Sequence, residues 1–239
     1  MIRAALALTA ALGVWAGAAG AVECSDITYL DAAFTICTVD PAREDLRLFL
    51  RGADGQPYEE FTAVERATGP LAFAMNAGMY HPDRRPVGLY VEDGIAETPL
   101  LTADSADNFG LLPNGVLCIG DGWARVVETL AFAAAPPDCR YASQSGPMLV
   151  IDGALHPRFL PDSTFRNIRN GVGAGGGRVV FAISNQPVTF YQFALLFRDG
   201  LALGNALYFD GSISRLYAPG LDRADWGAAM GPIVGIVAQ

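Results

Sequence analysis

The sequence predicts an α+β protein, a single domain with a mixed, strand-rich sheet core and few helices. Many short apolar or alternating segments are separated by Gly, Pro and Asp-Gly turns, and only two segments show helical periodicity. The last third of the chain has the order strand, helix, strand. With 239 residues, of which 51% are hydrophobic and 17% charged, the chain is long enough to bury one full core.

Residues 1–21 have the features of a secretory signal peptide. A single Arg3 precedes an apolar run, and the sequence AGA at residues 19–21 fits the rule of small residues at a cleavage site. The apolar run is close to the roughly 18 residues that cross a bilayer, so an uncleaved anchor is the alternative. Its small residues favour cleavage, which predicts a periplasmic or secreted domain over residues 22–239 with no stable membrane anchor.

The charge of the chain excludes several classes of function. Its formal net charge is −9, and removal of Arg3 makes it one unit more negative. Nucleic acid and anionic membranes are therefore not expected partners. The chain contains no lysine, which excludes Schiff-base chemistry and the phosphate-binding lysine of P-loop enzymes.

The four cysteines predict structural disulfides. Three pairings are possible in an oxidising compartment, and we favour Cys24 with Cys37 and Cys118 with Cys139 because each bond closes a short loop. There is no CxxC motif and no Cys/His cluster, so no metal and no cofactor is predicted.

The first half of the chain predicts mostly strands. Residues 24–30 and 34–40 form a hairpin pattern, and residues 45–51 continue as a third strand. An amphipathic helix follows with Phe61 and Val64 facing inward. We expect this helix to cover residues 58–68. The other expected elements of this half are a buried strand at 71–80 and hairpin strands at 89–94 and 114–122.

The second half predicts the strand, helix, strand unit. Thr189 is a suitable N-cap and Gly200 a suitable end for a helix over residues 190–199. Residues 131–137 are expected to form a surface connection. The expected strands of this half cover residues 148–153, 178–184 and 205–211.

Four predicted strands carry polar residues next to glycine at one end. A side chain at such a position is held by the sheet while it faces a cleft, and the glycine allows close approach of a ligand. The alternative for an Asp-Gly pair is a hairpin turn. Asp210 differs because it follows a fully apolar strand. The four clusters contain Asn76 and Gly78; Ser145 and Gly146; Arg169 and Asn170; and Asp210 and Gly211.

In this order, the clusters NAGM, SGPMLV, RNGVG and ALYFDGSIS resemble the phosphodiester glycosidase family over roughly residues 70 to 215. The resemblance implies an α+β fold and cleavage between a sugar anomeric carbon and a phosphodiester. The sequence departs from the family where it has Asp-Gly-Ser-Ile-Ser instead of Asp-Gly-Gly-Gly-Ser. The resemblance implies catalytic roles for Asn76, Arg169 and Asp210, and substrate contacts by Ser145, Gly146, Asn170, Gly211, Ser212 and Ser214.

These side chains suit the implied chemistry. Arg169 offers a bidentate clamp for a phosphodiester anion, and Asp210 can stabilise or attack an anomeric carbon that develops positive charge. Two more substrate contacts are expected. His81 lies five residues after Asn76, with a solvated loop histidine as the alternative, and Asn185 follows a strand that a right-handed crossover would place beside the strand of Asp210.

The sequence thus supports an exported hydrolase that cleaves a sugar–phosphodiester bond in an envelope glycan or exopolysaccharide. Its partner would be a carbohydrate or sugar-phosphate substrate. The alternative is a non-catalytic periplasmic protein that binds a glycan or a protein partner in the same cleft. A metal-dependent phosphodiesterase is a third hypothesis, which removal of divalent cations tests.

Overall fold

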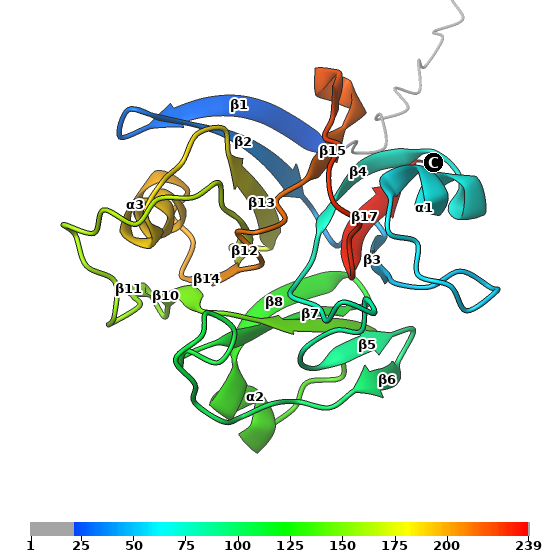
Figure 1. The fold of residues 1–239 in the computed structure, drawn as a ribbon, viewed down its shortest axis with the longest axis horizontal. Coiled ribbons are helices and arrows are strands. Elements are labelled where there is room, and N and C mark those ends of the chain that lie inside the picture. Colours follow the sequence, from blue (N-terminus) through cyan, green and yellow to red (C-terminus); the bar gives the residue numbers. More distant parts are fainter. Residues whose placement is uncertain (1–21, 239) are drawn as a thin grey trace, which may run out of the picture.

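A computed structural model describes residues 22–238, so the predicted signal peptide lies outside the described residues. The fold is mostly β, with three antiparallel sheets and three short α-helices in this part of the chain (Figure 1). The sequence predicted a mixed sheet. This was wrong, because every strand pairing within residues 22–238 is antiparallel.

The largest sheet begins with the predicted hairpin. Cys24 and Cys37 are directly opposite each other in its register, and the predicted disulfide joins them. The seven strands, in spatial order, are β1 (Glu23–Tyr29), β2 (Ala32–Val39), β13 (Arg178–Ser184), β12 (Asn170–Gly175), β14 (Asn205–Tyr208), β10 (Met148–Ile151) and β11 (Ala154–Leu155).

Two five-stranded sheets complete the fold. One has the order β16 (Arg223–Ala224), β15 (Leu216–Ala218), β4 (Leu71–Asn76), β17 (Ile233–Val237) and β3 (Leu46–Phe49). The other has the order β6 (Ile95–Thr98), β5 (Tyr90–Glu92), β9 (Tyr141–Ser145), β7 (Gly115–Gly120) and β8 (Trp123–Glu128). The predicted Cys118–Cys139 disulfide ties β7 to the segment that precedes β9.

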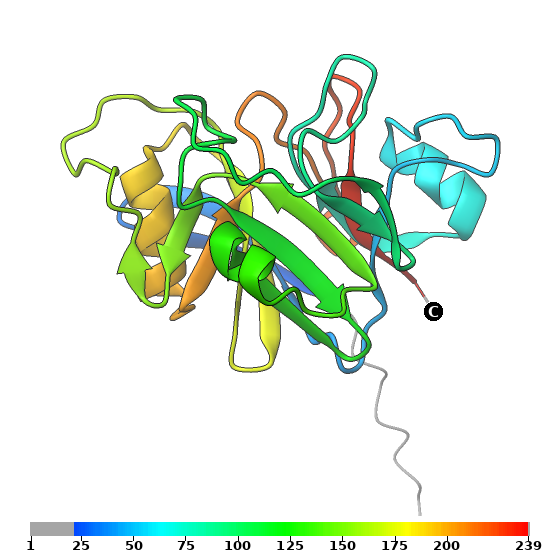
Figure 2. The same ribbon diagram turned by 90° about the horizontal axis from the view of Figure 1, so that it is seen from below.

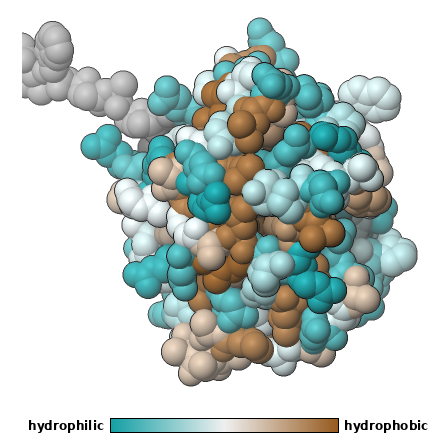
Figure 3. Space-filling view, turned by 90° about the vertical axis from the view of Figure 1, so that its left-hand side faces the viewer, coloured by the Kyte–Doolittle hydropathy of each residue, from teal (hydrophilic) through white to brown (hydrophobic). Residues whose placement is uncertain are grey.

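The three sheets share one apolar core, and each helix covers the outer face of a different sheet. The common core takes side chains from all three sheets, such as Phe181, Met75 and Leu117. Helix α3 (Phe190–Leu195) packs on the seven-stranded sheet, α1 (Phe61–Thr68) on β4 and β17, and α2 (Thr129–Ala134) on β7. On the side of the molecule that carries α3, apolar and hydrophilic side chains are interspersed over the surface (Figure 3).

Helices α1 and α3 agree with the sequence. Phe61 and Val64 are buried as expected, although α1 begins at Phe61 and not at residue 58. Thr189 caps α3 in a capping box with Gln192, and a π-helical turn continues to Gly200. The expected surface connection at residues 131–137 was wrong in its first part, because α2 lies there and buries Phe132.

The strand, helix, strand unit differs from its prediction in one respect. Strands β13 and β14 run in the same direction, but β12 lies between them and pairs with both. Asn170 begins β12 and lies opposite Ile183, at the edge where β13 and β14 end. This edge brings together three of the chain segments that carry the predicted site.

Candidate functional site

A cleft of about 1270 Å³ opens beside the end of β14. Its floor contains Tyr208 and the residues that follow β14, and the loop of residues 100–110 forms one wall. The loops that surround it lie along the same side of the molecule, at the top of Figure 2. Its lining residues include Tyr80, Thr102, Asp107, Asn108, Phe165, Tyr208, Asp210, Gly211, Ser212 and Ile213.

Asp210 lines this cleft with a partly buried carboxylate. Its Oδ1 accepts hydrogen bonds from the backbone N–H groups of Ser212 at 2.8 Å and Ile213 at 3.4 Å. Burial raises the pKa of Asp210, and the backbone N–H groups offset part of this effect. Both of these hydrogen bonds go to Oδ1, so the carboxylate is anchored through one of its two oxygens.

Two buried asparagines hold the loop that carries Asp210. The side chain of Asn170 accepts from the backbone N–H of Asp210 at 3.1 Å and donates to Oδ1 of Asn76. Asn76 also accepts from the backbone N–H of Arg215 at 3.0 Å and donates to the carbonyl of Ile213 at 2.7 Å. Asn76 and Asn170 are both fully buried, so they position the loop and do not line the cleft.

The predicted serines also bond to this loop. Ser145 is buried at the end of β9 and donates to the carbonyl of Phe209 at 2.8 Å. Ser214 donates to the carbonyl of Asp210 at 3.1 Å. The third predicted serine, Ser212, is exposed and lines the cleft.

The two predicted glycines stand where a side chain does not fit. A Cβ on Gly146 would lie 2.5 Å from the carbonyl oxygen of Phe109. A Cβ on Gly211 would lie 2.0 Å from the Tyr208 hydroxyl. Gly211 therefore allows the Asp210 loop to pass directly over the Tyr208 hydroxyl.

The structure places Arg169 behind the cleft wall, not in it. Its side chain is fully buried, with the guanidinium carbon 3.6 Å from the ring centre of Phe190 and 5.6 Å from that of Tyr208. Nε donates to the carbonyl of Val188 at 2.9 Å, and Nη2 donates to that of Phe165 at 3.5 Å. Nη1 is buried with no hydrogen-bond partner among residues 22–238. Burial lowers the pKa of the guanidinium, and Tyr208 beside it opposes part of this effect.

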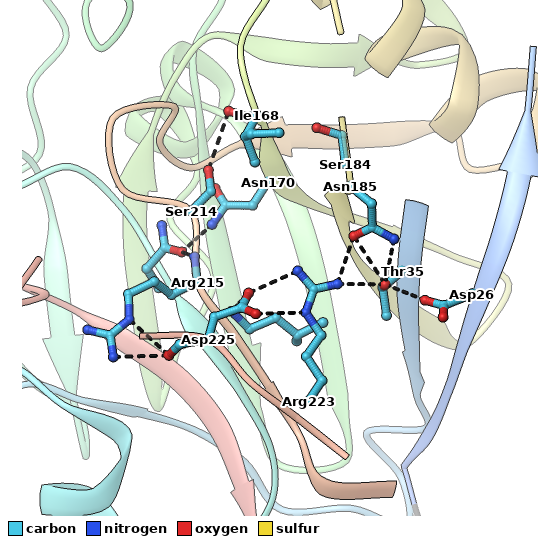
Figure 4. Close-up of polar contacts among 12 residues, drawn as sticks. Asp26, Thr35, Ile168, Asn170, Ser184, Asn185, Ser214, Arg215, Arg223 and Asp225 are labelled. Atoms are coloured by element: carbon cyan, nitrogen blue, oxygen red, sulfur yellow. Dashed lines mark hydrogen bonds and ion pairs between the residues drawn. The ribbon is translucent and has the colours of Figure 1, made fainter. Parts of the chain in front are cut away.

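His81 and Asn185 do not line the cleft. His81 is exposed in the loop after β4, where its backbone N–H bonds to Arg85. Asn185 donates to Thr35 at 3.0 Å and accepts from Arg223 at 2.8 Å, at the junction of β2 and β16 (Figure 4). The expected neighbour relation failed here because β12 separates β13 from β14.

Several cleft residues were not found by sequence reasoning. Tyr208 was assigned only to a buried strand, although it directly precedes Phe209 and Asp210. Tyr80 follows the NAGM cluster and bonds to the carbonyl of Ala229 at 2.6 Å. The nearness of Tyr208 to a motif carboxylate was the available signal, but the sequence does not show which strand face reaches the cleft.

No group of three or more His, Cys, Asp and Glu side chains is arranged to hold a metal ion in the part of the chain that the structure describes. Across the same residues, no helix has the length and apolar character needed to cross a membrane.

The fold and the ordered clusters are those of the phosphodiester glycosidase family. The sequence profile of that family matches residues 70–227, and the chain belongs to this family, as the sequence predicted. A relative from Escherichia coli (strain K12), the "Uncharacterized protein YigE", is 35% identical over 206 residues, which are 84% of this chain and 81% of that protein.

Two solved structures share the fold at low sequence identity. The zebrafish N-acetylglucosamine-1-phosphodiester alpha-N-acetylglucosaminidase catalytic domain, auto-inhibited by its pro-peptide, superimposes with a TM-score of 0.64 at 16% identity. This match covers 91% of this chain and 82% of the zebrafish chain. A hypothetical protein from Synechocystis gives 0.60 at 14% identity, over 91% of this chain and 62% of the other.

Proposed function

We propose that this protein is an exported hydrolase that cleaves the bond between a sugar anomeric carbon and a phosphodiester in an envelope glycan or exopolysaccharide. The observation that carries the proposal is the Asp210 carboxylate, fixed through one oxygen by two backbone N–H groups while it lines a large cleft. Family membership supports the reaction type. The zebrafish enzyme with the same fold is named for an N-acetylglucosamine phosphodiester.

In the proposed reaction, water cleaves the bond between the anomeric carbon and its oxygen. The products are a free sugar and a phosphomonoester, which keeps the bridging oxygen. Positive charge develops at the anomeric carbon in the transition state, and Asp210 stabilises this charge or forms a bond to the carbon. The leaving phosphate is a weak base, so a second carboxyl group is not needed as a strong acid.

Substrate turnover tests this proposal. Methyl phosphodiesters of the 1-phosphates of glucose, galactose, mannose and N-acetylglucosamine are incubated with the protein, and release of free sugar is measured. We expect release from at least one diester and a loss of at least 10³-fold in kcat for Asp210→Asn. Asp121→Asn is the matched control, because Asp121 is an exposed Asp-Gly turn residue outside the cleft. Full activity of Asp210→Asn would refute the catalytic role.

The alternative function is non-catalytic binding of a glycan or protein partner in the cleft. Two observations favour it: Ile213 stands where sugar-cleaving relatives have glycine, and no residue that lines the cleft carries a positive charge. Calorimetric binding of a glycan by wild type, without release of sugar under any condition, would support this alternative. Turnover of any diester would reject it.

Export is the second part of the proposal. The two disulfides support an oxidising compartment. Fractionation of cells that express the full chain should find the protein outside the cytoplasm, with a mature N-terminus at Val22. A cytoplasmic protein that retains Met1 would refute export.

A further inference from the structure

The cleft carries negative charge where the proposed substrate is anionic. Asp107 and Asp210 are the charged side chains among its lining residues, and both are acidic. A phosphodiester at neutral pH carries one negative charge, so its binding requires a compensating donor or cation. Arg169 has a buried guanidinium beside the cleft, packed against Phe190 and the lining residue Tyr208.

Tyr208 connects this guanidinium to the cleft. Its side chain is 1% exposed, yet it lines the cleft floor. The hydroxyl lies beneath Gly211, and it is close enough to both Arg169 and Asp210 for the first to lower and the second to raise its pKa. A hydroxyl at this position is placed to donate to a ligand atom that sits near the Asp210 carboxylate.

The protonation state of Tyr208 makes it a donor. Burial raises the pKa of Tyr208, and Arg169 beside it opposes only part of that effect. The phenol therefore remains protonated at neutral pH, while the guanidinium of Arg169 keeps its charge. Behind it, the buried Nη1 of Arg169 has no hydrogen-bond partner in the described part of the chain, an unfavourable arrangement that an anion bound nearby would relieve.

We propose that Tyr208 donates a hydrogen bond to the substrate phosphate and that Arg169 is a positioning residue that acts through Tyr208. The inference rests on the proposed function for the identity of the ligand. The sequence led us to expect that Arg169 binds the phosphate directly. In this inference the neutral Tyr208 hydroxyl makes that contact, and the buried charge of Arg169 lies behind it. The Gly211 backbone is part of the arrangement, because any side chain there would occupy the place of the Tyr208 hydroxyl.

Binding measured without turnover tests this inference. In an Asp210→Asn background, the four hexose methyl phosphodiesters are titrated by calorimetry against the protein with Tyr208→Phe or Tyr217→Phe added. Tyr217 is the matched control, because its hydroxyl bonds to Glu65 on α1 and not in the cleft. We expect Tyr208→Phe to weaken binding roughly 10- to 100-fold, as for a lost hydrogen bond to a charged group, and Tyr217→Phe to leave it unchanged.

The outcomes separate this inference from the proposed function. Weakening by Tyr208→Phe alone supports the contact, whether or not wild type releases sugar. Equal binding by both variants overturns the contact, while turnover by wild type still decides the function. Failure of all four diesters to bind also overturns it.

A double-mutant cycle tests the indirect role of Arg169. If Arg169 acts through Tyr208, Arg169→Met weakens binding in the Asp210→Asn protein. The same substitution then has little further effect once Tyr208→Phe is also present. Additive losses would show that Arg169 contacts the substrate itself and would overturn this part. Thermal unfolding of each variant is measured first, and if Arg169→Met does not fold, the comparison of the two tyrosine variants decides the inference.

Discussion

Asn76 and Asn170 bond to each other through their side-chain amides and together hold both ends of the loop that carries Asp210. Asn76 comes from β4 of a five-stranded sheet, and Asn170 comes from β12 of the seven-stranded sheet. The pair therefore joins two sheets at the point where the candidate catalytic carboxylate leaves the core.

Replacement of Asn76 by Ala should destabilise the fold. It would leave the buried backbone groups of Ile213 and Arg215 and the amide of Asn170 without partners, at about 1–3 kcal/mol for each unsatisfied group. We expect a loss of about 2–5 kcal/mol in the free energy of unfolding, measured by urea denaturation. Asn185→Ala, at the exposed junction with Arg223, is the control and should cost less. A variant of Asn76 with normal stability but no activity would show that this side chain acts on the substrate.

Asp210→Asn should make the protein more stable while it removes activity. Burial raises the folded-state pKa of Asp210, so at neutral pH the ionised carboxylate is less favourable in the folded than in the unfolded chain. Asparagine keeps an oxygen for the N–H groups of Ser212 and Ile213 but carries no charge. We expect a higher melting temperature at pH 7 and a difference from wild type that shrinks as the pH falls through the pKa of Asp210. A lower melting temperature at pH 7 would contradict this account.

The activity of the proposed enzyme should fall on the acid side at a pH above the ordinary range of aspartate. The carboxylate must be ionised to act on the anomeric carbon, and burial raises its pKa. In the pH profile of kcat/KM, the midpoint of the acid limb should therefore lie above the usual aspartate pKa of about 4. Asp107, whose pKa the Gly110 N–H holds down, is the control, since Asp107→Asn should not move this limb. If the midpoint of the acid limb lies below pH 4, the ionised carboxylate of buried Asp210 is not the group whose protonation limits activity.

Gly211→Ala should be destabilising in a way that Tyr208→Phe relieves. The new Cβ would meet the Tyr208 hydroxyl, and overpacking of this kind costs about 1–3 kcal/mol. Removal of the hydroxyl opens the space, so the double variant should recover part of the loss in unfolding free energy. Gly153→Ala is a contrasting control, because nothing lies within 4 Å of its Cβ and any cost there comes from its positive φ of 82°. Simple additivity of Gly211→Ala and Tyr208→Phe would refute the contact.

Both disulfides should contribute to stability. They close loops with sequence separations of 13 and 21 residues, for which chain entropy predicts about 3 kcal/mol each. Paired Cys→Ser variants, followed by urea denaturation, should show losses of this size, slightly larger for Cys118 and Cys139. Because the replaced bond is no longer there to be reduced, dithiothreitol should lower the unfolding free energy of each variant by less than that of wild type. A loss near zero would mean that the β1–β2 register or the β7 contact holds the chain equally well without the bond.

The strands predicted from sequence all have apolar or alternating side chains, although the apolar strand β17 was not among them. β12 was missed because half of its six residues are glycine, which removes the pattern that marks a strand. β9 was missed because three of its five buried residues are polar. Ser143 and Ser145 donate to backbone carbonyls, and Gln144 bonds to the backbone of Leu89 and Leu101, so these residues satisfy their polar groups inside the fold.

The predicted motif residues lie together around the loop of Asp210, but the sequence could not show which of them line the cleft and which hold the loop. Asn76 and Asn170 lie under the loop of Asp210 because antiparallel β12 begins where β14 ends, a relation that depends on the whole sheet order. Arg169 is enclosed by Val188 and Phe165, which come from segments with no strand or helix pattern. Spacing along the chain contains no information on which of these side chains face a cleft.

The floor and the wall of the cleft differ in how well they tolerate amino-acid substitutions. Its floor is tied into the core by Asn76 and Asn170, while the wall at residues 100–110 is irregular in structure and largely exposed. Substitutions at exposed wall positions such as Thr102 or Asn108 should alter stability by no more than about 0.5 kcal/mol. The wall can therefore change in sequence with little effect on the fold, while a single set of buried amides keeps the carboxylate in place.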